Sequence, residues 1–214
     1  MFIPVSVVIY FYIHITKDKK TPFLALFRMI LQLLLIGYLL VYIFDAKTPL
    51  IVGIVLFIML IFASLISLRP LDKKSFILYK AAFMAISIGA LSTLFIVVFL
   101  VLQAKFFYEP RVVIPLAGMA FANAMNAISI YAERFFASKK EDEAFKASLI
   151  PIINSFFAVG LVSLPGMMTG QILSGVDPLI AVRYQILVML MVFSSSGLSV
   201  ILFRAFISKK LKAI

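Results

Sequence analysis

Residues 159–185 read VGLVSLPGMMTGQILSGVDPLIAVRYQ, an apolar stretch that is interrupted near its middle. A segment that serves only as a membrane anchor is built from Leu, Ile and Val, whereas this one contains a Pro-Gly pair, adjacent methionines, a Thr and a Gln. Lipid cannot hydrogen-bond a freed backbone carbonyl or a polar side chain, so such an interruption needs neighbouring protein or water around it. The stretch is therefore the first candidate for a functional site.

The composition indicates an integral membrane protein. The chain has 214 residues, of which 64% are hydrophobic, and its mean hydropathy is +1.16. A soluble domain of this length carries far more polar surface. The net charge of +11 is explained by basic loops on the cytoplasmic side of a membrane, without any nucleic-acid partner. The absence of cysteine excludes disulfides, thiol nucleophiles and thiolate metal sites, and the single histidine cannot form a metal site alone.

Apolar runs predict an all-α, polytopic protein of about seven transmembrane helices in a single domain, residues 1–214. Three helices begin with a capping residue followed by proline, at Thr21-Pro22, Thr48-Pro49 and Asp177-Pro178. The first helix is short, because a span normally needs about 20 residues. The predicted ranges are 2–15, 21–44, 48–68, 76–103, 112–131, 149–173 and 177 to the basic tail that starts at Arg204.

The basic residues are distributed unevenly between the two sides of these helices. Of the 20 lysines and arginines, sixteen lie in or near the loops after the first, third, fifth and seventh helices. The opposite side holds only Lys47, Lys105, Arg111 and Arg183. Because basic loops stay in the cytoplasm, the N-terminus is predicted to face out and the C-terminus in. The expected location is the cytoplasmic (inner) membrane of a bacterium.

Polar residues occur inside two of the predicted helices. Gln32 lies too deep in the second helix to reach the headgroups, so we expect it to bond another helix or face a cavity. Asn123 and Asn126 share one face of the fifth helix, near mid-membrane. Such amides either join helices or line a substrate path, and both interpretations stay open.

The sixth helix carries the interrupted stretch. Pro165 lacks an N–H and frees the carbonyl of Leu161, which predicts a kink or a break. Gly166 and Gly170 form a small-residue face of the kind along which helices associate. Met167 and Met168 either fill packing gaps or meet a soft metal ion, and Thr169 and Gln171 add polar groups beside the break. A gate or a subunit interface is the resulting hypothesis.

Residues 133–146, ERFFASKKEDEAFK, are cytoplasmic by the charge rule. They form either a solvated loop or a short amphipathic helix, with Phe145 and Leu149 one turn apart, that docks on a partner. The chain has no phosphate-binding loop, no His-Glu cluster and no nucleophile at recognisable spacing from a base. We therefore expect no enzyme, no catalytic residue and no bound cofactor.

Several motifs resemble those of FetB-type permease subunits of ABC transporters, which include bacterial iron exporters and plant aluminium-sensitivity proteins. The run LVSLPGMMTGQIL is the most specific of them, and the likeness covers most of the chain from Arg28 onward. The matching segments are RMILQL at 28–33, PLAGM at 115–119, Asn123 with Met125-Asn126, Ile150-Pro151 with INS at 153–155, residues 159–173, Asp177-Pro178 and RYQI at 183–186.

The resemblance implies a permease that pairs with a separate cytoplasmic ABC ATPase, which hydrolyses the ATP, and that acts as a homodimer in the lipid bilayer. It also implies metal-ion export, with iron as the best-known cargo. Family members have a longer stretch between the fifth and sixth helices, with a LALGA-like segment that resembles a coupling helix. Here residues 132–148 form a shortened coupling segment, with Arg134, Lys139, Lys140 and Phe145 as candidate ATPase contacts.

The resulting hypothesis assigns the interrupted helix and its neighbours to a cargo path. Pro165, Gly166 and Gly170 would form the kink and the helix contact. The rival hypothesis is a non-transporting assembly or regulatory subunit that has lost ATPase coupling. The candidate path residues are Gln32, Asn123, Asn126, Met167, Met168, Thr169 and Gln171.

Overall fold

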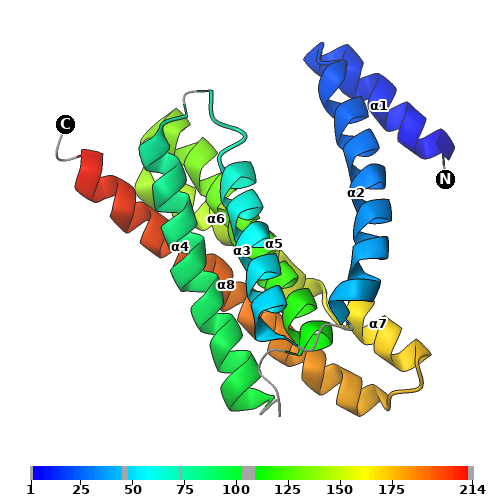
Figure 1. Ribbon diagram of the computed structural model, residues 1–214. Coiled ribbons are helices and arrows are strands. Elements are labelled where there is room, and N and C mark those ends of the chain that lie inside the picture. The colour runs from blue at the N-terminus through cyan, green and yellow to red at the C-terminus, as the bar shows by residue number, and fades with distance from the viewer. Residues whose placement is uncertain (1, 45–47, 73, 103–108, 212–214) are drawn as a thin grey trace. The chain divides into compact units, whose positions relative to one another are not determined.

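The computed structural model describes residues 2–44, 48–72, 74–102 and 109–211. Among them every regular element is a helix, which confirms the all-α prediction. The chain divides into two compact units, residues 1–47 and 48–214, and each is described by itself (Figure 1).

The first unit contains α1 (Phe2–Thr16) and α2 (Lys20–Phe44). The predicted cap of the second helix was wrong, because Asp18 and not Thr21 caps α2. The Asp18 carboxylate accepts hydrogen bonds from the backbone N–H groups of Lys20 (3.0 Å) and Thr21 (3.1 Å), two of the donors that a helix start leaves unpaired. Lys17 makes the turn between the helices with a φ of 57°.

The second unit contains the remaining helices, and three of them differ from the prediction. The predicted fourth helix changes to π-helical geometry for its last described turn, and its predicted end at Gln103 lies outside the described residues. The fifth helix is longer than predicted, and the sixth is divided in two. The elements are α3 (Pro49–Ser67), α4 (Phe76–Phe95), η1 (Ile96–Val101), α5 (Pro110–Ser138), α6 (Glu141–Ala158), α7 (Gly166–Leu173) and α8 (Pro178–Leu211).

Five of the described helices are long and apolar enough to cross a membrane, so the chain is a multi-pass integral membrane protein. α1 has only 15 residues, and the predicted sixth span is represented by α6, a connecting segment and α7. The count of seven spans and the orientation stay predictions. The five helices are Lys20–Phe44, Pro49–Ser67, Phe76–Val101, Pro110–Ser138 and Pro178–Ser208.

The core of the second unit forms where α8 packs against α4 and α5 (Figure 1). Small residues let these helices approach closely, as is usual in membranes. A Cβ atom at Gly89 of α4 would lie only 2.5 Å from the Ser199 hydroxyl on α8. Ser195 of α8 donates to the Ala120 carbonyl of α5 (3.4 Å) and to its own helix at Val192 (3.0 Å). The interface therefore depends on close backbone contact and bonds from hydroxyl groups.

Candidate functional site

The interruption in the stretch that follows α6 is a complete break in the helix. α6 ends at Ala158, whose carbonyl accepts bonds from the N–H groups of Val162 (2.8 Å) and Ser163 (3.2 Å). Gly160 donates to the Ser163 carbonyl (3.0 Å), which closes a tight turn. Pro165 is the residue just before α7. An N–H at that position would have no partner within the helix, so the proline removes no helical hydrogen bond. The prediction of a continuous helix 149–173 was therefore wrong, and the alternative of a break is the correct one.

Gly160 is the residue that permits this turn, since its φ of +83° lies in the left-handed region. We expect Gly160→Ala to lower the free energy of unfolding by about 1–2 kcal/mol, because a Cβ atom is strained there even though nothing lies within 4 Å of it. Gly166→Ala is the matched control, since its surroundings are equally open and its φ is not positive. Thermal unfolding in detergent would measure both, and equal melting temperatures would contradict the expectation.

Gly166 and Gly170 make no close contact with another helix of the described chain. A Cβ atom built at either glycine meets nothing within 4 Å. Within one chain, α7 therefore does not use the predicted small-residue face, and association of this face with a second molecule stays a prediction.

The adjacent methionines of α7 line two different cavities. Met167 lines a cavity of about 530 Å³ between α5, α7 and α8. Met168 lines a second cavity, of about 390 Å³, between the break, α7 and α8. The hydroxyl of Thr169 bonds the Pro165 carbonyl of its own helix turn (3.1 Å), so it is already satisfied.

The 530 Å³ cavity brings Met167 together with Gln171, as the sequence pattern predicted, and adds residues that it did not. Met119 of α5 contributes a further thioether, and Arg111 and Tyr184 contribute polar groups. The Oε1 atom of Gln171 is buried and has no hydrogen-bond partner among the described residues. A buried amide oxygen without a partner is costly, so its retention favours a ligand-binding role.

The two asparagines of α5 have different environments. Asn123 is half-buried and donates from Nδ2 to the Met119 carbonyl of its own helix (2.8 Å). Asn126 is exposed. The bond that joins α5 to α3 comes instead from Ser129, whose hydroxyl donates to the Ser67 carbonyl (2.7 Å). A single serine in a helix gives no sequence signal of its partner, so this link was missed.

Gln32 belongs to α2 in the first unit, where its side chain is exposed. No residue of α2 is buried. Within that unit Gln32 is therefore open to a bond with another helix or with cargo.

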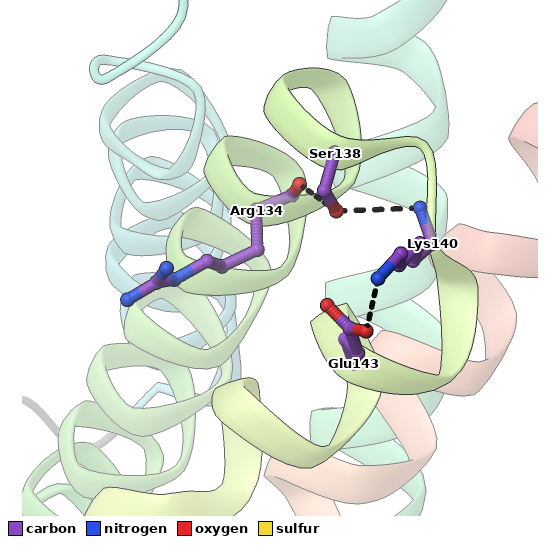
Figure 2. A network of polar contacts seen from close by, with 4 residues as sticks. All are labelled: Arg134, Ser138, Lys140 and Glu143. Carbon is purple, nitrogen blue, oxygen red and sulfur yellow. Dashed lines mark hydrogen bonds and ion pairs between the residues drawn. The ribbon is translucent and has the colours of Figure 1, made fainter.

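The predicted coupling segment forms a helical hairpin, not a loop. α5 continues to Ser138, Lys139 turns the chain with a φ of 60°, and α6 starts at Glu141. The Ser138 hydroxyl donates to the Arg134 carbonyl (3.0 Å) and accepts from the Lys140 N–H (3.3 Å), and both bonds are drawn in Figure 2. Phe145, half-buried on α6, is the remaining coupling candidate. The segment is therefore helical on both sides of a turn, and its docking on a partner stays a prediction.

Both lysines of the turn are engaged inside the hairpin. Lys140 forms an ion pair with Glu143 (2.7 Å), and Lys139 lies 4.9 Å from the ring centre of Phe136. The hydrogen bond that Lys140 donates to the Glu143 carboxylate raises the pKa of Lys140 above its usual value. Because the folded-state pKa is raised, the contribution of this pair is fully present at neutral pH and is lost only as the pH rises through that value. The side chain of Arg134, whose carbonyl bonds Ser138, points away from the Lys140–Glu143 pair (Figure 2).

An ion pair joins the hairpin to the last helix. Glu141, in the first turn of α6, pairs with Arg204 of α8. The acidic start of α6 also suits the positive end of the helix dipole. Nothing in the sequence pattern pairs these residues, which lie far apart along the chain.

Among the residues that the structure describes, no three His, Asp or Glu side chains gather as metal ligands.

Comparison with known proteins places these features in context. The model of the uncharacterised protein family UPF0014 matches residues 1–143 and 138–211. A UPF0014 membrane protein of Synechocystis is 34% identical over 197 residues, which cover 81% of this chain and 76% of that protein. The "Probable iron export permease protein FetB" of Escherichia coli is 34% identical over 204 residues (82% and 75%). ALUMINUM SENSITIVE 3 of Arabidopsis thaliana is 30% identical over 198 residues (80% and 70%). No solved structure matches.

Proposed function

The chain belongs to the UPF0014 family of membrane proteins, and from this premise we propose that it is the permease subunit of an ABC-type metal-ion exporter. A separate cytoplasmic ATPase powers it, and iron is the cargo we favour. The observation that carries the proposal is the 34% identity, over 82% of the chain, to a protein named as an iron export permease. The relatives are named as membrane proteins and a permease, not as enzymes.

In this proposal the cargo rests in the 530 Å³ cavity. Met119 and Met167 offer polarizable sulfur atoms, and Gln171 offers a buried amide oxygen that has no hydrogen-bond partner among the described residues. Thioether and carbonyl donors bind transition-metal ions, whereas the positive charge of Arg111, which lines the same cavity, keeps that binding weak. A site that binds without strong charge pairing also releases its ion easily, which a transport step requires.

A stripe on α5 leads from this cavity along the helix. Met119, Ala122, Asn126 and Glu133 follow helical spacing on one face, and the last three are exposed. The stripe carries small and polar residues where a lipid-facing helix would carry large aliphatic ones. In the proposal, cargo moves along this stripe between the Glu133 end and the cavity.

The α5–α6 hairpin is the proposed contact for the ATPase. The two parts of the family match meet at residues 138–143, in this hairpin, which supports a segment shorter than in other members. Lys139 and Lys140 are exposed, but each already contacts a side chain of the hairpin, whereas the Arg134 side chain points away from the Lys140–Glu143 pair, so Arg134 is the contact we favour. The Glu141–Arg204 pair would pass a movement of the hairpin to α8, whose other end lines both cavities.

The shortened hairpin also favours a second candidate function. A family member without a complete ATPase contact would serve as an assembly or regulatory subunit and not as a transporter. The divided family match is the observation that favours this alternative.

Reconstitution tests the proposal directly. The protein would be placed in vesicles together with a cytoplasmic ABC ATPase that co-purifies with it, and ATP-driven movement of Fe²⁺ would be followed with a trapped chelating dye. We expect Gln171→Leu to slow Fe²⁺ movement about tenfold, the loss that follows when one bond to a charged group is removed.

Thr169→Val is the matched control, because the Thr169 hydroxyl is already bonded within α7 and should not contact the ion. Asn123→Leu should likewise have a small effect, since its amide bonds its own helix. Full transport by Gln171→Leu would contradict the proposed path. Absence of ATP-driven transport in the unmodified pair would favour the regulatory alternative.

A further inference from the structure

The 390 Å³ cavity beside the break has a lining that differs in chemistry from that of the proposed cargo path. Its walls come from the end of α6, the break, α7 and the first turns of α8. Of the described residues that line it, none is charged and only Gln185 has a polar side chain. Its volume falls in the range of about 300–1,000 Å³ that is typical of small-molecule sites.

Gln185 has no hydrogen-bond partner for its Oε1 atom among the described residues, although only 6% of the residue is exposed. Buried amides are almost always hydrogen-bonded, because an unpaired one loses its water without compensation. The thioether of Met168 and the side chain of Met189 lie around it as adaptable apolar walls. An apolar site with one unsatisfied amide suits a mostly hydrocarbon ligand that carries a single polar group.

The entrance to this cavity is apolar. Three of its lining residues, Leu164, Ile186 and Leu190, are 58%, 56% and 56% exposed. Leu161 and Val162, in the adjoining turn, are also exposed. In a membrane protein such an exposed aliphatic surface faces hydrocarbon, so a molecule reaches the cavity from the bilayer and not from water.

We propose that this cavity binds a neutral amphiphile from the surrounding bilayer. The hydrocarbon chain of the ligand fills the space between the break, α7 and α8. A hydroxyl group or another uncharged donor of the ligand bonds the Gln185 amide. The site is separate from the cavity that holds Met167 and Gln171, and the proposal does not depend on metal transport.

Tryptophan quenching provides the test, because the chain contains no tryptophan. Leu190→Trp puts a single fluorophore at the mouth of the cavity. The probes are a brominated long-chain alcohol and its methyl ether, which have the same chain but differ in the hydroxyl donor. Both would be added to vesicles of unbrominated phosphatidylcholine that contain the variant.

We expect the alcohol to quench the tryptophan fluorescence at low membrane concentration, with a quenching that saturates. Quenching by the ether should only rise in proportion to the amount of ether in the bilayer. Adding Gln185→Leu should remove the saturable part of the quenching by the alcohol, because the hydrogen bond that distinguishes the alcohol from the ether is lost. Val182→Phe, which fills the cavity, should abolish the saturable part. Leu198→Trp, on the same helix but outside the cavity lining, is the control and should show no saturable part.

Equal quenching by the two probes would overturn the proposal, as would saturable quenching that survives Gln185→Leu. Crosslinking of two copies through the mouth of the cavity, with no saturable quenching, would assign the cavity to an interface between copies and would also overturn it. Elution of each variant as a single peak in detergent checks that it folds.

Discussion

Gly89→Ala is expected to lower the free energy of unfolding by about 3 kcal/mol, near the upper end for overpacking a core. Its new Cβ atom would lie 2.5 Å from the Oγ atom, 2.7 Å from the backbone nitrogen and 3.0 Å from the Cα atom of Ser199. Two of these three atoms belong to the backbone, so no change of rotamer relieves the overlap. α4 and α8 must move apart, and they form the most extensive helix contact of the second unit. Unfolding by SDS titration in mixed micelles would measure the loss.

Gly53→Ala is the control for this experiment. Gly53 lies within α3, and a Cβ atom there meets nothing within 4 Å. Alanine is the better helix former, so this variant should be as stable as the parent or more stable. Adding Ser199→Ala to Gly89→Ala should restore little stability, because the backbone nitrogen stays in place. A Gly89→Ala protein as stable as Gly53→Ala would show that the two helices are not in close contact.

Tyr131 should respond in opposite directions to two substitutions. Tyr131 is fully buried. Its ring stacks on that of Phe135, with 5.7 Å between the ring centres, and meets the Phe203 ring edge-on, with 6.2 Å between the ring centres. Tyr131→Ala removes these contacts and leaves a cavity, which should cost about 3–5 kcal/mol. Tyr131→Phe keeps the ring and removes a hydroxyl that has no partner among the described residues, so stability should be unchanged or higher.

The pair of variants separates ring packing from the hydroxyl. Both would be measured by the same SDS titration as the parent protein. A loss of more than about 1 kcal/mol in Tyr131→Phe would mean that the hydroxyl makes a hydrogen bond in the folded protein. Such a bond would connect α5 to the region of the Glu141–Arg204 pair and would add to the proposed link between hairpin and α8.

The features predicted correctly from the sequence are those that depend on neighbouring residues along the chain. Long apolar runs predicted the membrane class and the five helices that are long and apolar enough to span, because hydrocarbon selects for composition over about 20 residues. The Asp177-Pro178 pair predicted the start of α8, and the Asp177 carboxylate accepts from the N–H groups of Leu179 (2.9 Å) and Ile180 (3.3 Å). The motif around Pro165 identified the family and located the interruption, although it did not decide between a kink and a break.

The errors and omissions have a common physical cause. Capping of α2 by Asp18, the full break after Ala158 and the helical hairpin at 133–146 all depend on which of several local conformations the surrounding helices stabilise. Sequence periodicity alone does not distinguish a kinked helix from two helices joined by a turn. Residues near helix ends are therefore the least predictable part of this chain.

The sequence by itself determined that this chain is a helical membrane protein and which family it belongs to. These properties follow from composition and motif, which are local. Only the tertiary structure decided that Met167 and Met168 line different cavities and that Glu141 pairs with Arg204. It also decided that the Oε1 atoms of Gln171 and Gln185 have no hydrogen-bond partner among the described residues. Those facts depend on how α5, α7 and α8 are rotated and spaced against one another. That packing is set by contacts between side chains that lie far apart in the sequence.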